Sequence, residues 1–192
     1  MSLSRPYRRS TGWPRARRWV RWIGSLILLG AMVWAVWSWP DQSYDLVTPP
    51  AGASVRALDG DSFDIGTGDQ RQRIRLDGID APERNQLCAR ADGAPWPCGM
   101  TAHAALTEML LAPGLRCDAR AQDRYQRRVA RCRTDRVADL AAEMVLQGHA
   151  VATGRADDPR YGVEEERARM ARRGLWQGRF ERPADWRSSH PR

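Results

Sequence analysis

Two acidic segments of this sequence have the residue types of a metal site. Residues 73–83 read RIRLDGIDAPE, and the end of this predicted strand carries Asp80 and Glu83. Pro82 lies between the two acids, and its fixed backbone angle favours a turn that aims both side chains to one side. Hard oxygen ligands one turn apart, with a backbone carbonyl between them, suit Ca²⁺. The competing interpretation is a solvated strand end with a local ion pair from Arg75, and this segment alone leaves both interpretations open.

The second acidic segment is LDGDSFDI, in which Asp59 and Asp61 flank a glycine. Asp-Gly favours the turns of tight β-hairpins, and a hairpin turn is the ordinary interpretation of this segment. Asp61, however, follows the turn at the start of the next predicted strand, where turn geometry does not require a carboxylate. Asp61 is therefore a further candidate ligand.

A basic segment, DRYQRR, covers residues 123–128 at the tip of a later predicted hairpin. Arginines at a hairpin tip are usually exposed to solvent, and this interpretation applies to most of those present here. Tyr125 can stack on a nucleobase or can simply cover the hairpin. The segment alone does not decide between binding and solvation.

Short strands that alternate with helices position these candidates. The expected elements are the strands of an antiparallel meander (55–58, 62–65, 73–76), a hairpin (115–121 with 128–133) and three helices (100–111, 138–147, 163–173). Five short strands interleaved with three helices predict an α+β fold, a small five-stranded β-barrel capped by the helices.

The positive charge of the chain is concentrated at its N-terminus. The formal net charge is +8, but residues 1–21 hold seven arginines and no acid, and the remaining 24 basic residues nearly balance the 23 acids. The basicity therefore gives no indication of a nucleic-acid substrate. Residues 22–39 carry no charged side chain, and as a helix they would span about 27 Å, close to the hydrocarbon thickness of a bilayer. We expect a transmembrane signal-anchor here.

The residues around this anchor predict its topology. Arginines precede it and Asp41 and Asp45 follow it, which predicts a cytoplasmic N-terminus and a periplasmic or extracellular domain. The run is longer than a typical signal-peptide core and no small-residue cleavage site follows, so we favour a single-pass inner-membrane anchor over a cleaved segment that releases a secreted domain. The remaining divisions are a linker (40–53), the main domain (54–187) and a tail (188–192).

All four cysteines follow the expected anchor, in what should be an oxidising compartment. Cys88 and Cys98 share one loop rich in proline and glycine. Cys117 and Cys132 are equidistant from the middle of the hairpin turn, so they should face each other on adjacent strands. We expect the disulfides Cys88–Cys98 and Cys117–Cys132. The alternative is a zinc site, which scattered histidines and the lack of a CxxC pair disfavour.

The order of the segments carries more information than any one of them. LDGDSFDI, RIRLDGIDAPE, DRYQRRVA, MVLQGHA and EERARMARRGLW follow one another. Their order and residues resemble the staphylococcal nuclease (thermonuclease) family over residues 54–187, and the combination of DGD, R-x-x-x-x-D-x-P-E and D-R-Y-x-R is specific. The resemblance implies an OB-fold domain, expected to be monomeric, that hydrolyses single-stranded or unpaired DNA and RNA with Ca²⁺.

The resemblance also implies roles for the acidic residues. Asp61 and Asp80 match the metal-binding carboxylates. Ala81 falls where the family often has a threonine whose backbone carbonyl reaches the metal, a contact that alanine can keep. Glu83 matches the catalytic glutamate that positions or deprotonates the attacking water.

The basic residues receive roles in the same way. Arg75 and Arg127 match the two arginines that hold the scissile phosphate and contribute to catalysis. Tyr125 matches a tyrosine near the terminal phosphate of the nucleotide, and Arg124 is assigned with it to substrate binding. Arginine suits phosphate because it stays charged and donates two parallel hydrogen bonds.

The chain departs from the family pattern at two positions. Gln126 replaces the glycine that is usual at the hairpin tip, and Thr153 stands where many relatives carry an aromatic residue. Tyr161 is a nearby candidate to replace that aromatic ring. The alternative function is a non-catalytic module of the same fold that binds nucleic acid or a protein.

Overall fold

The computed structural model describes residues 28–32, 34, 45–154 and 160–191. The chain divides into two units, Met1–Gln42 and Ser43–Arg192. In the first unit, the described residues are helical and exposed. Most of the expected signal-anchor, residues 22–39, lies outside the described residues. Among those that are described, no helix is both long and apolar enough to cross a membrane.

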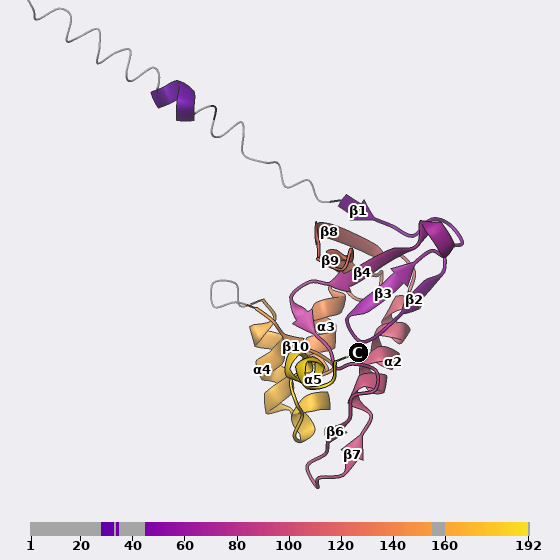
Figure 1. Cartoon of the computed structure of the whole chain (residues 1–192), viewed down its shortest axis with the longest axis vertical. Coiled ribbons are helices and arrows are strands. Elements are labelled where there is room, and N and C mark those ends of the chain that lie inside the picture. The colour runs from indigo at the N-terminus through magenta and orange to yellow at the C-terminus, as the bar shows by residue number, and fades with distance from the viewer. Residues whose placement is uncertain (1–27, 33, 35–44, 155–159, 192) are drawn as a thin grey trace, which may run out of the picture. The chain divides into compact units, whose positions relative to one another are not determined.

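A six-stranded mixed sheet is the centre of the second unit (Figure 1). In spatial order its strands are β1 (Asp45–Val47), β8 (Arg116–Gln122), β9 (Arg128–Arg133), β4 (Gln72–Leu76), β3 (Ser62–Ile65) and β2 (Val55–Ala57). Neighbouring strands are antiparallel except β4 and β9, which are parallel. The expected meander (β2, β3, β4) and the expected hairpin (β8, β9) are both confirmed.

The expected closed five-stranded barrel is wrong for the described residues. The sheet has six strands, and its edge strands β1 and β2 are not paired with each other. The additional strand comes from residues 40–53, which were expected to form only a linker: Leu46 pairs with Asp118 of β8, and Val47 is buried. β1 therefore extends the sheet at one edge instead of leaving it to close on itself.

Two short strand pairs lie outside the main sheet. β5 (Ile79–Asp80) pairs with β10 (Val151–Ala152), and this pairing fixes the backbone just after β4. β6 (Cys88–Ala89) pairs with β7 (Pro95–Trp96) inside the segment that was expected to be an irregular loop. The chain that follows β4 is thus held by hydrogen bonds on both sides of the predicted acidic turn.

The three expected helices are present with shifted ends, as α2 (Cys98–Leu110), α3 (Leu140–Leu146) and α4 (Gly162–Met170). Asp139 accepts hydrogen bonds from two backbone N–H groups at the start of α3, as an N-cap does. A further helix, α5 (Pro183–Ser189), was not expected. It begins with proline at a first-turn position, where the missing N–H group costs nothing. Single turns of 3-10 helix occur at η1 (Gly68–Gln70) and η2 (Gly174–Gln177).

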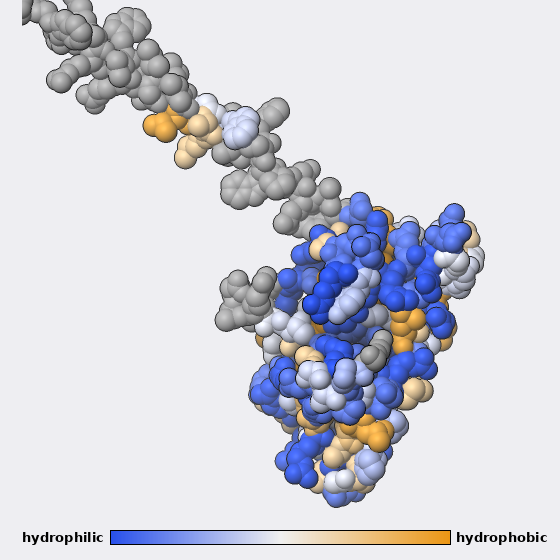
Figure 2. Space-filling model, in the orientation of Figure 1, coloured by the Kyte–Doolittle hydropathy of each residue, from blue (hydrophilic) through white to orange (hydrophobic). Residues whose placement is uncertain are grey.

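The core lies between the sheet and the helices, because α2 packs against β2 and α3 packs against β9. The fully buried side chains of this cluster include Phe63, Ile74, Leu76, Leu106 and Met144. Alternation along β4 buries its aliphatic residues and turns the intervening arginine to the opposite face. Figure 2 shows a face of the unit on which hydrophilic residues predominate and apolar residues are scattered.

Both expected disulfides are confirmed, which rules out the alternative zinc site built on these cysteines. Cys117 and Cys132 are directly opposite each other in the β8–β9 register. Cys98 is the first residue of α2, so its disulfide to Cys88 ties the start of that helix to β6. Leu175 and Val151 pack around the Cys88–Cys98 disulfide in a smaller apolar cluster.

Candidate active site

Arg75 is the centre of a buried charge cluster. Its Nη1 atom donates to Asp61 Oδ1 at 2.8 Å and its Nη2 atom donates to Asp80 Oδ1 at 3.0 Å. The two acids are almost completely buried, whereas one fifth of the Arg75 side chain is exposed. The structure therefore brings Asp61 of one acidic segment to Arg75 and Asp80 of the other, and it places a positive charge between the two predicted metal ligands.

The sheet register brings these residues together. Ser62 of β3 is opposite Arg75 of β4, and Asp61 immediately precedes β3. The Asp59–Asp61 turn is tightened by a hydrogen bond from the Asp61 N–H group to Asp59 Oδ1 at 3.0 Å. Gly60 is required within this turn, because a Cβ atom there would lie 2.7 Å from the Cβ atoms of Ala81 and Ala102.

Burial dominates the electrostatics of Asp61. Desolvation raises its pKa to about 6, although the Arg75 charge and a hydrogen bond from Ser62 oppose this rise. The Ser62 hydroxyl donates to Asp61 Oδ1 at 2.7 Å, and the Ala81 N–H group donates to Oδ2 at 3.1 Å. The pKa of Arg75 is raised, because its two acidic partners outweigh the loss of solvent. The cluster therefore keeps Arg75 charged, whereas ionisation of the buried Asp61 carboxyl group costs free energy.

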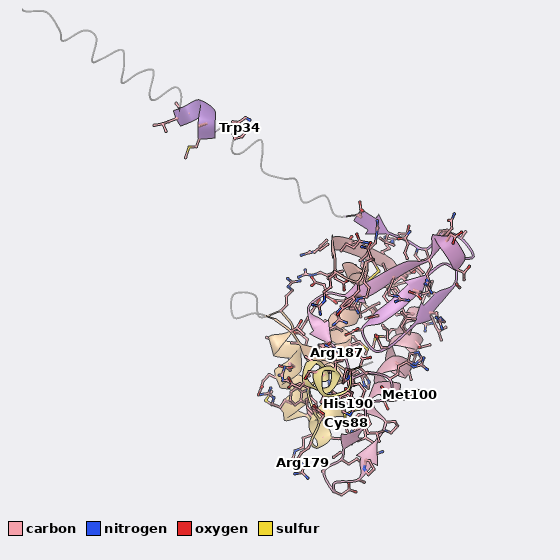
Figure 3. The ribbon with its side chains drawn as sticks, viewed as in Figure 1. Trp34, Cys88, Met100, Arg179, Arg187 and His190 are labelled. Carbon is pink, nitrogen blue, oxygen red and sulfur yellow. A yellow bond between two sulfur atoms is a disulfide. The ribbon has the colours of Figure 1, made fainter. Side chains whose placement is uncertain are left out.

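Arg187 reaches the same cluster from α5 and was not predicted. Its Nη2 atom donates to Asp80 Oδ2 at 2.9 Å, and its Nη1 atom is 3.5 Å from Glu83 Oε1. Desolvation opposes a rise in its pKa, but the bond to Asp80 and the nearby acids raise it overall. Figure 3 shows Arg187 on α5. Arg187 thus joins the predicted metal ligand Asp80 to the predicted catalytic residue Glu83.

Glu83 is held in place through its backbone. Its N–H group donates to the side-chain oxygen of Gln86, a fully buried residue whose Nε2 atom donates to the carbonyl of Glu181 at 2.8 Å. The start of α2 packs directly on the Glu83 carbonyl, so closely that a Cβ atom at Gly99 would lie 1.7 Å from it. Glycine at position 99 therefore permits this contact, and nothing in the sequence alone distinguished it from a loop glycine.

The hairpin tip holds its charged residues by local contacts. Arg127 Nε donates to Asp123 Oδ2 at 2.7 Å, and the N–H groups of Tyr125 and Arg127 donate to Asp123 Oδ1. Although desolvation acts against it, these hydrogen bonds lower the pKa of Asp123. The guanidinium groups of Arg124 and Arg127 lie over the Tyr125 ring, 4.8 Å and 5.3 Å from its centroid. Gln126 adopts a left-handed backbone with φ of 64°, the conformation that the usual glycine would adopt without strain.

One cavity of about 1250 Å³ joins the charge cluster to the hairpin tip. Its lining residues are Leu58, Asp59, Ser62, Arg73, Arg75, Glu83, Arg84, Asn85, Asp123, Arg124, Tyr125, Arg127, Trp186, Arg187, His190 and Pro191. All five predicted catalytic and substrate-binding residues belong to this set. The predicted metal ligands Asp61, Asp80 and Ala81 do not; they are buried, and Arg75, which lines the cavity, donates to both acids.

Tyr161 does not offer an open aromatic face in place of the one missing at Thr153. Its hydroxyl donates to Asp139 at 3.0 Å, and its ring packs against the main apolar cluster. The ring also lies close to Gly78, where a Cβ atom would be 2.9 Å from it. Burial and the neighbouring Asp139 raise the pKa of Tyr161, which keeps the hydroxyl protonated as the donor of this bond. Tyr161 therefore contributes to packing.

The donor set of the cluster fits a hard cation. Asp61 and Asp80 already share one positive group, the guanidinium of Arg75, so the space between them accommodates positive charge. Carboxylate oxygens and backbone carbonyls are the ligands that Ca²⁺ prefers, and the backbone of Ala81 reaches this cluster through its N–H group, which donates to Asp61. Within the described residues, no group of three or more acidic, histidine or cysteine side chains is arranged to hold a metal ion. Backbone oxygens and water would complete the coordination.

Comparisons with known proteins identify a family and several relatives. The family described as Staphylococcal nuclease homologue matches residues 73–178. The protein ParB of Escherichia coli is 35% identical over 136 residues, which are 65% of this chain and 71% of ParB. The succinoglycan biosynthesis protein ExoI of Rhizobium meliloti (strain 1021) is 29% identical over 143 residues, 71% of this chain and 73% of ExoI. The micrococcal nuclease of Shigella flexneri is 29% identical over 148 residues, 71% of this chain and 79% of that nuclease.

Proposed function

This chain belongs to the staphylococcal nuclease homologue family, and from that premise we propose that it is a Ca²⁺-dependent nuclease that hydrolyses DNA and RNA. The observation that carries the proposal is the position of Arg75. This arginine is bound to two buried acids and lines a cavity that also contains Glu83 and Arg127. Relatives named as nucleases support the same class of activity.

The charges of the cavity suit hydrolysis of a phosphodiester. Attack by water adds negative charge to the phosphorus centre, and guanidinium groups that are already oriented stabilise it. Arg75 would bind the scissile phosphate from the sheet and Arg127 from the hairpin tip. Asp61, Asp80 and the carbonyl of Ala81 would hold Ca²⁺, whose charge near the phosphate oxygens favours the same transition state.

Glu83 would orient the attacking water and accept its proton. Its carboxylate lines the cavity beside Arg75, and its backbone is fixed by Gln86 and by the start of α2. A carboxylate positioned in this way can act as a general base once the water lies between it and the phosphate. Tyr125 and Arg124 would bind the nucleotide on the side of the hairpin tip.

We also propose that residues 22–39 anchor the nuclease in the inner membrane, with the domain in the periplasm or outside the cell. The support is the uncharged length of this run, its preceding arginines and its flanking tryptophans. The two disulfides agree with an oxidising compartment. Protease treatment of intact cells and spheroplasts tests the topology: the domain should be digested only after the outer barrier is opened, and digestion restricted to inverted membranes would refute it.

The catalytic proposal is tested with the full chain purified in detergent with its disulfides intact. Single-stranded DNA and RNA should be cleaved with Ca²⁺ and not with a chelator. Glu83→Gln should lower kcat by about 100- to 10,000-fold, because the variant loses the group that accepts the proton. Glu108→Gln is the matched control, since Glu108 is exposed on α2 and does not line the cavity. Folded wild-type protein that binds these strands and never cleaves them would support the non-catalytic module instead.

A further inference from the structure

Helix α5 lies outside the residues that match the family, yet it forms one wall of the cavity. The family match ends at residue 178, whereas Trp186, Arg187 and His190 all line the cavity. We propose that the stacked side chains of Trp186 and His190 form a binding subsite for an unpaired nucleobase next to the phosphate that is cleaved. This inference rests on the proposed nuclease function and names a part of its substrate site.

The two rings form a flat aromatic surface that is already ordered. Their centroids are 4.3 Å apart and their planes differ by 10°. His190 Nδ1 lies 3.0 Å from the carbonyl of Trp186 and 3.1 Å from Ser189 Oγ, so the imidazole is held by its own helix end. Trp186 is only half-buried and His190 is exposed. A stacked pair with accessible surface can receive a base without first losing rotamer freedom.

Contacts on both sides of α5 fix this surface relative to the reactive groups. Arg187, between the two rings in the sequence, is bound to Asp80 and lies beside Glu83. Ser189 donates to the carboxylate of Glu181, the residue whose carbonyl accepts from the buried Gln86. The aromatic pair is therefore attached to the same groups that place Glu83, and a base bound there would belong to the strand under attack.

The rest of the cavity has the composition of a site for single-stranded nucleic acid. Six of its lining residues are arginines and three are acidic, so positive charge predominates. Tyr125, with 62% of its surface exposed, supplies an aromatic ring at the hairpin tip. Proteins that bind single strands combine such arginines with aromatic rings on which bases stack. The volume of about 1250 Å³ exceeds the usual range for a drug-sized ligand and suits a segment of a polymer.

The test measures binding separately from cleavage. The full chain in detergent is titrated, in the presence of a chelator, into a fluorescent oligothymidylate and into the same sugar-phosphate strand without bases. Fluorescence anisotropy gives both Kd values, and their ratio reports how much the bases contribute. Because stacking on one aromatic residue typically strengthens binding severalfold to about a hundredfold per base, Trp186→Leu should reduce this ratio about fivefold or more.

Trp186→Phe is the matched variant, because it keeps an aromatic ring where leucine keeps only apolar bulk. The ratio of the two Kd values should stay close to that of the wild type in Trp186→Phe, and it should fall in part in His190→Ala. Trp176→Leu removes an indole that packs on Phe180 outside the cavity, and its ratio should stay that of the wild type. Circular dichroism of each variant identifies any that is unfolded.

The outcomes separate this inference from the nuclease proposal. Cleavage by the wild type, together with an unchanged base contribution in Trp186→Leu and His190→Ala, overturns the subsite and leaves the nuclease standing. A ratio that falls in Trp186→Leu, in a protein that never cleaves, supports the subsite and overturns the nuclease. A wild type that binds both strands equally, or neither, overturns the subsite.

Discussion

The two arginines proposed to bind the phosphate are almost equally exposed, but their acidic partners are not. Arg75 keeps 20% of its side-chain surface exposed and Arg127 keeps 22%. The partners of Arg75 are Asp61 and Asp80, at 3% and 5%, whereas the partner of Arg127 is Asp123, at 20%. Arg75 thus neutralises buried charge, and Arg127 is held by an acid that water still reaches.

The two ion pairs also differ in how the chain builds them. Asp61 and Arg75 are 14 residues apart and meet only because β3 and β4 pair in one register. Asp123 and Arg127 are four residues apart and meet within a single turn. A long-range buried pair depends on the whole fold, and loss of one partner leaves a buried charge unpaired, whereas a local pair depends on its own turn. The tip keeps its ion pair although Gln126 adopts a left-handed conformation.

Removing Arg75 should have the largest effect. Arg75→Met leaves Asp61 and Asp80 buried without their common partner, and breaking such a pair typically costs about 3–5 kcal/mol of unfolding free energy. Urea unfolding of the full chain in detergent with chelator measures this. Arg127→Met is the matched control, and its expected loss is about 1 kcal/mol or less because water can solvate Asp123. Equal losses in the two variants would contradict the distinction between the two arginines.

Asp61 and Asp123 should contribute to the pH dependence of stability with opposite signs. Asp61 titrates near 6 in the folded chain but near 3.8 when unfolded, so between these values the folded state holds more protons. Stability therefore decreases as pH rises through this window. The unfolding free energy of the wild type minus that of Asp61→Asn, both measured in chelator, should fall by on the order of 2 kcal/mol from pH 4 to pH 7.

Asp123 provides the comparison for this pH dependence. Its pKa is lowered in the folded chain, so its stabilisation is present above the unfolded value and is lost as pH falls through the folded value. The unfolding free energy of the wild type minus that of Asp123→Asn should therefore increase as pH rises from acid. The corresponding difference for Asp61→Asn should decrease. Two curves with the same sign would show that burial does not distinguish these acids.

The smallest effect should come from the tip backbone. Gln126→Gly removes a side chain from a left-handed position and should raise the unfolding free energy by up to about 1 kcal/mol, with kcat unchanged. Gln147→Gly is the matched control, because Gln147 has φ of −83° and gains nothing from glycine there. Thermal or urea unfolding checks both variants. A loss of stability in Gln126→Gly would show that the glutamine side chain is required, for example through the hydrogen bond that its Oε1 atom accepts from Gln122.

Much of the fold follows from short-range patterns in the sequence. Alternation predicted the meander and the later hairpin, and equal distances from a turn predicted the pairing of Cys117 with Cys132. The additional strand β1 was not predictable in the same way, because it has only three residues, too few for an alternating pattern. Whether a sheet closes depends on its edges, and the edge here comes from a segment with the composition of a linker.

The candidate site shows the same division between residues that local patterns indicate and residues that only long-range contacts bring in. Asp61, Arg75, Asp80 and Glu83 could be named because their segments keep recognisable residue types and spacing, and the structure brings them together. Arg187 could not be named, because it is one of many arginines in the sequence. Its helix, α5, has only seven residues and no clear apolar period. Contacts between residues more than a hundred positions apart leave no mark on local sequence.

The first two residues of α2 link covalent chemistry to the position of Glu83. Cys98 is bonded to Cys88, and Gly99 lies directly against the Glu83 carbonyl. A newly made chain with reduced thiols has the same side chains but lacks this covalent bond beside Glu83. If Glu83 acts as proposed, oxidation of this pair of sulfur atoms would fix the reaction centre as well as the fold, and full activity would then require a compartment where thiols are oxidised.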